Sequence, residues 1–207
     1  MKSFLLILLS LISFSSIASI EKYEEKARSG DAKSQYKLGL AYEFGRSVEQ
    51  DIYTAEYWYD KADKQGHLKA SARLGYLDYE AENYSSAKRY FAKGLKKGEE
   101  VYFSMLYYGK ILRLEGEEIK GLALTKIAAQ NGVPQAMSEW AYYNGHEASK
   151  KNYYSAYIYS KMAKIKKYKG EKDYTSYYRS KLTGNQISSA DKTATRMLKE
   201  FEAKKSK

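Results

Sequence analysis

Serine and lysine at the Ser-x-x-Lys spacing are the residues of this chain that could do covalent chemistry. With this spacing, penicillin-interacting enzymes place a lysine beside a nucleophilic serine. Examples of the spacing in this chain are Ser34/Lys37, Ser85/Lys88 and Ser189/Lys192. With 22 serines and 29 lysines among 207 residues, chance supplies about three such pairs. No KTG-like partner segment accompanies them, so the sequence predicts no nucleophilic serine.

The two histidines are the other residues with catalytic potential. They are His67 and His146, and the chain contains no cysteine. Two isolated histidines without cysteine or clustered carboxylates do not supply the ligand set of a zinc site. The P-loop, the GxSxG nucleophile motif and the dinucleotide fingerprint are also missing. We therefore expect no metal, no cofactor and no catalytic residue, and we interpret both histidines as structural or solvent-facing.

The positive charge of the chain is concentrated near its C-terminus. Residues 1–149 contain 20 Lys/Arg and 20 Asp/Glu, whereas residues 150–207 contain 16 and 5. We predict a basic surface in this tyrosine-rich segment, made of Lys161, Lys164, Lys166, Lys167 and Lys169. One interpretation is a solvated face over a tyrosine core. The other is a docking surface for an acidic protein or for anionic envelope components.

The stretch from Gly30 to Gly66 predicts two helices in one unit. Asp31 is suited to cap a first helix, and Gly45 is suited to end it because glycine enters the left-handed conformation cheaply. Asp51 then begins a second helix. The apolar positions of that helix follow the i, i+3, i+4, i+7 spacing of one buried face: Ala55, Trp58, Tyr59 and Ala62.

Related helix pairs follow along the chain. The predicted repeats cover about residues 31–66, 67–98, 99–132 and 133–167, and a capping segment covers 170–207. In the third repeat Leu124 replaces Trp58, so we expect this unit to be the least tightly packed. In the fourth repeat Pro134 is expected in the first turn of a helix that Gly145 ends.

One long pattern of fixed spacing runs through the first unit: Ala32, Leu38-Gly39, Tyr42, Gly45, Val48, Asp51, Ala55, Trp58-Tyr59, Lys61-Ala62 and Gln65-Gly66-His67. This pattern resembles a nearly complete Sel1-like repeat. The resemblance implies an all-α fold, a right-handed α-solenoid of about four helix-turn-helix repeats with a C-terminal capping helix.

The first 18 residues have the pattern of a signal peptide. Lys2 gives a positive start, residues 4–12 are almost entirely apolar, and residues 16–18 have the small-x-small form of a cleavage site. We therefore expect a mature chain, residues 19–207, that is periplasmic or secreted and does not span a membrane. Export would remove the protein from most nucleic acid, so we expect no nucleic-acid partner.

A second candidate surface follows if the first helix of each pair lines the concave side of the solenoid. Positions counted from the glycine of each first helix then give a predicted partner-binding strip: Lys33, Tyr36, Lys69, Tyr76, Tyr79, Lys110, Arg113 and Tyr142. Tyrosine and arginine commonly anchor protein interfaces. The alternative is that Tyr36, Tyr76 and Tyr142 complete the core between repeats.

The resemblance implies a non-enzymatic scaffold or adaptor that binds another protein in the periplasm or outside the cell. One alternative is an immunity protein that neutralises a secretion-system effector such as a lipase, as some exported Sel1-like proteins do. Another is a cell-wall or β-lactam-interacting hydrolase. Secreted Sel1-like proteins linked to β-lactam hydrolysis carry a cysteine pair in each repeat, and this chain has no cysteine.

Overall fold

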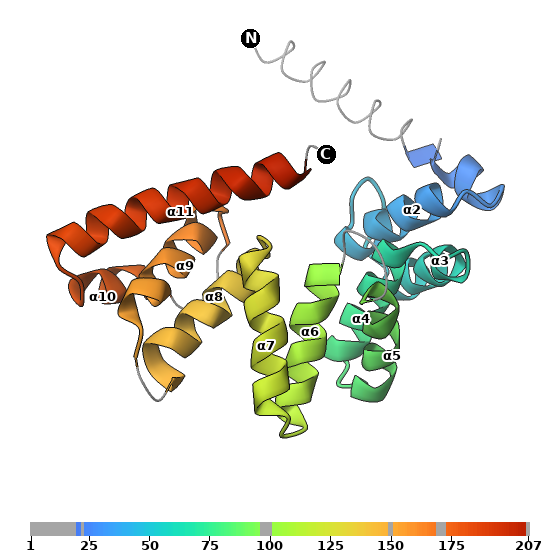
Figure 1. Ribbon diagram of the computed structural model, residues 1–207. Helices are drawn as coiled ribbons and strands as arrows, with labels where there is room; N and C mark the ends of the chain where they lie inside the picture. The colour runs from blue at the N-terminus through green and yellow to red at the C-terminus, as the bar shows by residue number, and fades with distance from the viewer. Residues whose placement is uncertain (1–19, 22, 96–100, 149–150, 169–172, 206–207) are drawn as a thin grey trace, which may run out of the picture. The chain divides into compact units, whose positions relative to one another are not determined.

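The computed structural model describes residues 20–21, 23–95, 101–148, 151–168 and 173–205. Within these ranges the chain is helical and contains no strand, which confirms the predicted all-α class (Figure 1). The predicted signal peptide lies outside the described residues. In the part of the chain that the structure describes, no helix has both the length and the apolar character needed to cross a membrane. The helices form two compact units, residues 1–100 and 101–207.

The first unit contains two helix pairs that pack along their lengths. They are α2 (Ala32–Phe44) with α3 (Ile52–Lys64), and α4 (Leu68–Glu80) with α5 (Tyr84–Gly94). The second helix of the first pair, α3, also packs on α4. Each helix therefore buries one face against its neighbours, as a repeat architecture requires.

Local capping signals in the first unit act as predicted. The Asp31 side chain caps α2 by accepting a hydrogen bond from Ser34 N at 2.7 Å. The Asp51 side chain caps α3 by accepting hydrogen bonds from two backbone N–H groups. Gly45 ends α2 in the left-handed conformation, with φ 61°. These three predictions are confirmed. Each feature depends only on residues next to the helix end, so it can be predicted from a short stretch of sequence.

The core of the first unit lies along α3 and α4. Ala55, Tyr59 and Ala62 have no exposed surface, as predicted, and they pack with Ala70 of α4. Trp58, which was predicted for the same stripe, is only half-buried. The buried face of α3 is therefore narrower than the spacing alone suggests.

Glycines in the first helix of each pair let an aromatic ring of the second helix approach the backbone. A Cβ on Gly39 would lie 2.5 Å from Tyr59 Cδ1, and a Cβ on Gly75 would lie 2.8 Å from Phe91 Cε1. Both rings are fully buried. The glycine positions of the repeat pattern are therefore packing positions, each matched to one ring.

The second unit contains a longer run of helices. These are α6 (Val101–Leu114), α7 (Glu118–Gln130), α8 (Pro134–Tyr142), the π-helix η1 (Tyr143–Glu147), α9 (Tyr153–Ile165), α10 (Thr175–Ser180) and α11 (Gly184–Lys205). Helices adjacent in sequence from α6 to α9 pack on one another, and α10 and α11 both pack on α9 (Figure 1).

The pair of α6 and α7 packs more closely than its residue sizes predict. A Cβ on Gly109 would lie 2.7 Å from the carbonyl oxygen of Gly121, so the two backbones meet directly. Leu106 and Ile111 of α6 are fully buried beside this contact. The expectation of loose packing around Leu124 is therefore wrong, because facing glycines shorten the distance between the helices and offset the smaller side-chain volume.

The end of α8 also differs from the prediction. Pro134 lies in the first turn of α8, as expected. Gly145 does not end the helix, however, because the chain continues as η1, whose Ala148 N donates to Tyr143 O at 2.8 Å. Gly145 is buried against Tyr178 of α10. This contact comes from a distant part of the sequence, which is why the local pattern did not predict it.

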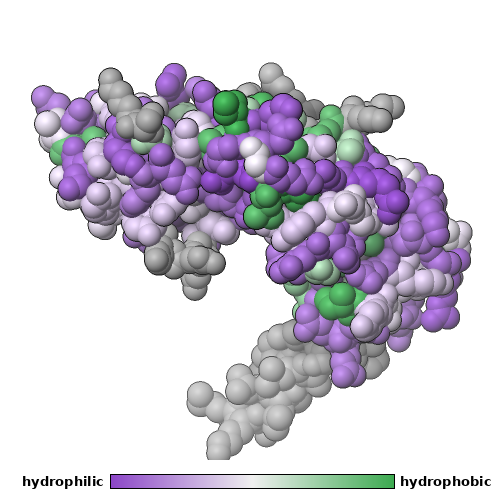
Figure 2. All heavy atoms as spheres, turned by 90° about the horizontal axis from the view of Figure 1, so that it is seen from below, coloured by the Kyte–Doolittle hydropathy of each residue, from purple (hydrophilic) through white to green (hydrophobic). Residues whose placement is uncertain are grey.

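In the described residues, the exposed large apolar side chains belong to several different helices. On the face seen in Figure 2, hydrophilic residues predominate and hydrophobic ones occur in small separate groups. The most exposed large apolar side chains in the described residues are those of Tyr53 and Ile119. Each is 85% exposed, and the two lie in different units. Single exposed apolar residues are normal on soluble surfaces, so they do not by themselves mark a binding site.

Candidate functional site: a tyrosine-lined cavity

A cavity of about 480 Å³ opens in the second unit between α8, α9 and α10. We call it the α8–α10 cavity. Four small residues from α8 and α9 contribute to its lining: Ser138, Ala141, Ser160 and Ala163. Thr175 and the rings of Tyr168, Tyr174 and Tyr178 also line it. Its charged lining residues, Lys164, Lys167 and Asp173, are all exposed to solvent. The cavity therefore combines an apolar interior with a charged edge.

Small side chains on α8 and α9 leave the space that the cavity occupies. Ala141 and Ala163 are almost fully buried, so neither helix fills the gap with a larger group. Protein interiors are close-packed and hold few voids larger than a water molecule. A cavity of this size falls instead in the range of sites that receive a ligand.

Tyr174 and Tyr178, which line the cavity, belong to a larger cluster of tyrosine and histidine rings. His146 stacks on Tyr142 with 4.6 Å between ring centroids, and it lies 4.7 Å from Tyr174. The Tyr178 hydroxyl oxygen lies 3.1 Å from His146 Nδ1, within hydrogen-bond distance. We call these four residues, with Tyr177 at 5.6 Å, the His146 cluster. His146 is therefore a packing residue, in agreement with its structural interpretation.

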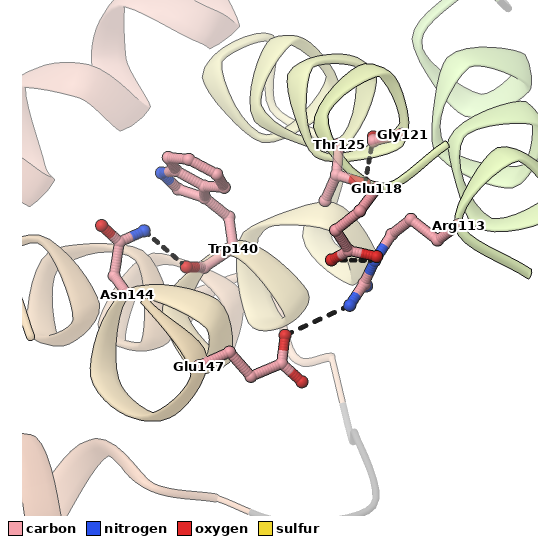
Figure 3. Close-up of polar contacts among 7 residues, drawn as sticks. All are labelled: Arg113, Glu118, Gly121, Thr125, Trp140, Asn144 and Glu147. Atoms are coloured by element: carbon pink, nitrogen blue, oxygen red, sulfur yellow. Dashed lines mark hydrogen bonds and ion pairs between the residues drawn. The ribbon is translucent and has the colours of Figure 1, made fainter. Parts of the chain in front are cut away.

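The π-helix η1 positions His146 in this cluster. The widened turn is supported by Asn144, whose Nδ2 donates to Trp140 O at 2.7 Å (Figure 3). Gly145 follows Asn144 and lies under the Tyr178 ring, where any side chain would collide with it. Burial raises the pKa of the Tyr178 hydroxyl, so Tyr178 stays protonated over the physiological range.

The charged edge of the cavity is held by one ion pair. Lys164 Nζ lies 2.8 Å from Asp173 Oδ2, and Asp173 Oδ1 accepts a hydrogen bond from Thr175 N at 2.9 Å. The hydrogen bond from Lys164 and those from Thr175 lower the pKa of Asp173 to about 2. Asp173 therefore stays ionised and joins the end of α9 to the start of α10.

Arg113, a residue of the predicted partner-binding strip, connects three helices of the second unit. Its Nε donates to Glu118 of α7 at 3.0 Å, and its Nη2 donates to Glu147 of η1 at 3.1 Å (Figure 3). Thr125 Oγ1 donates to Gly121 O in the same region. Arg113 thus connects η1 to α6 and α7. It therefore contributes to the packing of the second unit, in addition to any role in binding a partner.

The structure places the other residues of the strip in various contacts. In the first unit, Lys33 is exposed, Tyr36 stacks on His67 at 4.7 Å, and Lys69 is half-buried. Tyr76 lies 4.9 Å from the Arg73 guanidinium, and Tyr79 packs near Tyr84. In the second unit, Lys110 pairs with Glu139 at 2.6 Å and Tyr142 belongs to the His146 cluster. Whether these residues bind a partner stays a prediction.

Three lysines of the predicted basic surface have acidic partners. Lys161 pairs with Asp191 at 2.5 Å, Lys164 pairs with Asp173, and Lys166 pairs with Glu202. Lys167 is exposed at the cavity, and Lys169 lies outside the described residues. The sequence shows an excess of lysine here, but the fold places acidic residues beside three of the five.

Sequence reasoning missed most of the cavity. The sequence did not predict that Ala141, Ala163 and Tyr178 lie together, because a cavity depends on the distance between helices. One available signal was the tyrosine-rich segment around residues 174–178, which follows a run of lysines. Aromatic residues beside basic ones are typical of interface anchors.

The fold and the cavity define a helical repeat protein with a binding-sized cavity in its second unit. No family model matches the sequence. The chain is 35% identical over 75 residues to a putative sel1-like repeat-containing protein of Acanthamoeba polyphaga mimivirus, a match covering 36% of this chain and 14% of that protein.

Two solved structures share the fold. One is a protective antigen of uropathogenic Escherichia coli strains displaying an SLR fold, with TM-score 0.70, 22% identity and coverage of 88% of this chain and 41% of that chain. The other is a Sel1 repeat protein from Oxalobacter formigenes, with TM-score 0.56, 24% identity and coverage of 72% and 64%. The recognition of Sel1-like repeats and of their solenoid fold is confirmed. The chain spans 14% of its curated relative and under two thirds of each solved chain.

Proposed function

We propose that this protein is a non-enzymatic interaction scaffold that holds a segment of another protein in the α8–α10 cavity. The observation that carries the proposal is the cavity itself: about 480 Å³, lined by small residues and tyrosines. Tyrosine buries a large area with little loss of conformational entropy, and interface anchors commonly fill pockets of this kind. The similarity to proteins with Sel1-like repeats supports the same class of function.

The chemistry of His146 supports a scaffold rather than an enzyme. Its imidazole is packed by rings on several sides, and its Nδ1 lies within hydrogen-bond distance of Tyr178. A histidine used as a general base needs access to a substrate proton. Here the ring packs against Tyr174 and Tyr178, two residues that line the cavity.

The proposal includes export. The signal-peptide pattern in residues 1–18 supports a mature chain that begins at Ser19 and works in the periplasm or outside the cell. The partner is then an exported or envelope protein. Three paired lysines on the predicted basic surface make binding to anionic envelope components a weaker second candidate.

Affinity capture tests this function. Tagged mature protein is incubated with an envelope extract of its own cells at low salt and at about 0.15 M salt, where exposed charges are largely screened beyond roughly 8 Å. We expect one stoichiometric protein that survives the higher salt, and its identity would distinguish an adaptor from an immunity protein. Retention of nothing specific, or only of salt-sensitive anionic material, would contradict the proposal.

A further inference from the structure

Lys167 holds a backbone conformation that favours glycine. Its φ is 58°, in the left-handed region, where a side chain is disfavoured. A positive φ also follows other helices of this chain, at the non-glycine residue Glu82 and more often with glycine in place: Gly30, Gly45, Gly66, Gly116 and Gly132. At the end of α9, Lys167 N donates to Lys164 O at 2.9 Å and Tyr168 N donates to Ala163 O at 3.1 Å, the usual pattern of a glycine-ended helix. Lys167 therefore carries backbone strain that a glycine at this position would not have.

The strained lysine lies at the cavity. Lys167 lines the α8–α10 cavity and is exposed to solvent. Its neighbours Lys164 and Lys166 are paired with Asp173 and Glu202. Among the described residues no acidic side chain pairs with Lys167, so its ammonium is available to an anionic group of a bound molecule. Strain at a binding site is a common sign that a side chain is needed there.

The interior of the cavity has a different chemistry from its edge. Ala141 and Ala163 leave room for a large side chain, and the rings of Tyr168 and Tyr174 offer faces and edges for packing. Asp173 at the edge is already paired with Lys164, which limits its repulsion of an incoming carboxylate. The segment from residue 150 to 207 also carries 16 basic and 5 acidic residues, a field that attracts acidic partners.

We propose that the α8–α10 cavity recognises a short acidic segment of the partner protein. One large apolar side chain of that segment packs against Ala141 and Ala163, and a neighbouring carboxylate binds the Lys167 ammonium. This proposal rests on the proposed scaffold function and adds the chemical class of the segment that is bound. Lys167 acts as the specificity residue of the site.

Glu82 offers a matched control for a test of Lys167. Glu82 also has a positive φ, 60°, and its backbone makes the same pattern: Glu82 N donates to Tyr79 O, and Asn83 N donates to Asp78 O. It ends α4 in the first unit, far from the cavity residues in sequence. Both K167G and E82G should fold at least as stably as the wild type, since glycine relieves the left-handed strain.

The first measurement is a selection of random twelve-residue peptides on the mature chain, followed by fluorescence anisotropy of the best binder. We expect enriched peptides with an apolar residue next to Asp or Glu. K167G should weaken binding of the selected peptide about fivefold, the scale of one exposed charge contact, and E82G should leave it unchanged. Ala163→Phe, which fills the cavity, should weaken it further while circular dichroism stays helical.

Two results would overturn the proposal: selected peptides without the acidic and apolar pattern, or equal affinity of wild type and K167G for the selected peptide. The envelope capture keeps the two proposals apart. If the captured partner binds Ala163→Phe weakly but binds K167G as tightly as wild type, the scaffold function of the cavity stands and the acidic specificity through Lys167 is refuted. If the affinity of the selected peptides depends on Lys167 but no partner is captured from the envelope extract, the peptide site stands and the scaffold function is refuted.

Discussion

The ring of Tyr178 covers the backbone of Gly145 so closely that a Cβ on Gly145 would lie 2.8 Å from Tyr178 Cζ. Tyr178 is 1% exposed and also reaches His146. The contact joins η1 to α10 and fixes one wall of the α8–α10 cavity. The position must therefore be glycine for reasons of packing, not of backbone angle.

Gly145→Ala tests this contact. We expect a loss of about 1–3 kcal/mol in the free energy of unfolding, because the methyl group overpacks a buried ring. Urea denaturation of the mature chain measures it. Gly184→Ala is the control, since a Cβ on Gly184 meets nothing within 4 Å. Equal stability of the two variants would contradict the packing role of Gly145.

Arg73→Met tests the buried charge network of the first unit. Glu43 is 5% exposed, accepts a hydrogen bond from the Tyr59 hydroxyl at 2.6 Å, and pairs with the Arg73 guanidinium. Loss of Arg73 leaves a buried carboxylate without its cation, which costs about 3–5 kcal/mol. Thermal and urea unfolding should both show the loss.

The control for that prediction is Arg28→Met, which removes an exposed arginine from its pair with Glu24 at 3.7 Å. Exposed pairs contribute about 0–1 kcal/mol. The double variant E43Q/R73M should recover part of the stability lost in R73M, because no unpaired charge remains buried. A small loss in R73M, similar to that of R28M, would show that the network does not stabilise the unit.

Asp173→Asn tests the ion pair at the cavity edge through its pH dependence. The folded pKa of Asp173, about 2, lies below its ordinary value of 3.8. The ionised carboxylate therefore contributes stability above about pH 4, and this contribution is lost as the pH falls toward 2. The wild type should be more stable than D173N at neutral pH, and the difference should shrink below about pH 4. A difference that does not change with pH would contradict the assignment.

Gly121→Ala tests the close approach of α6 and α7. A Cβ on Gly121 would collide with the carbonyl of Gly109 and would lie 2.5 Å from Arg113 Cγ. We expect a loss of at least about 1 kcal/mol, although alanine is the better helix former. Urea unfolding of this variant and of the wild type measures the change. A gain in stability would contradict the close contact, because it would show that α6 and α7 can move apart at no cost.

Local signals in the sequence predicted the helix ends well. Asp31, Asp51, Gly45 and Pro134 act through neighbours within a few residues, so their roles can be read from a single stretch. Gly145 could not be read in this way, because its function depends on Tyr178, a residue of another helix. Spacing rules thus predict the elements more reliably than the contacts between them.

The candidate site was predicted less completely than the fold. An excess of lysine indicated a basic surface, but Asp173, Asp191 and Glu202 pair with three of its members across 9 to 36 residues of sequence. The cavity arises because Ala141 and Ala163 are small at the same place on two helices. Neither relationship is visible until the helices are packed.

Site-specific photo-cross-linking in the protein's own cells tests the scaffold function most directly. Benzoylphenylalanine replaces Tyr168, which lines the cavity, and separately replaces Lys120, an exposed residue of α7 with a 70% exposed side chain. We expect one cross-linked partner protein from position 168 and none from position 120. No cross-link at position 168, or the same products from both positions, would contradict a partner bound in the α8–α10 cavity.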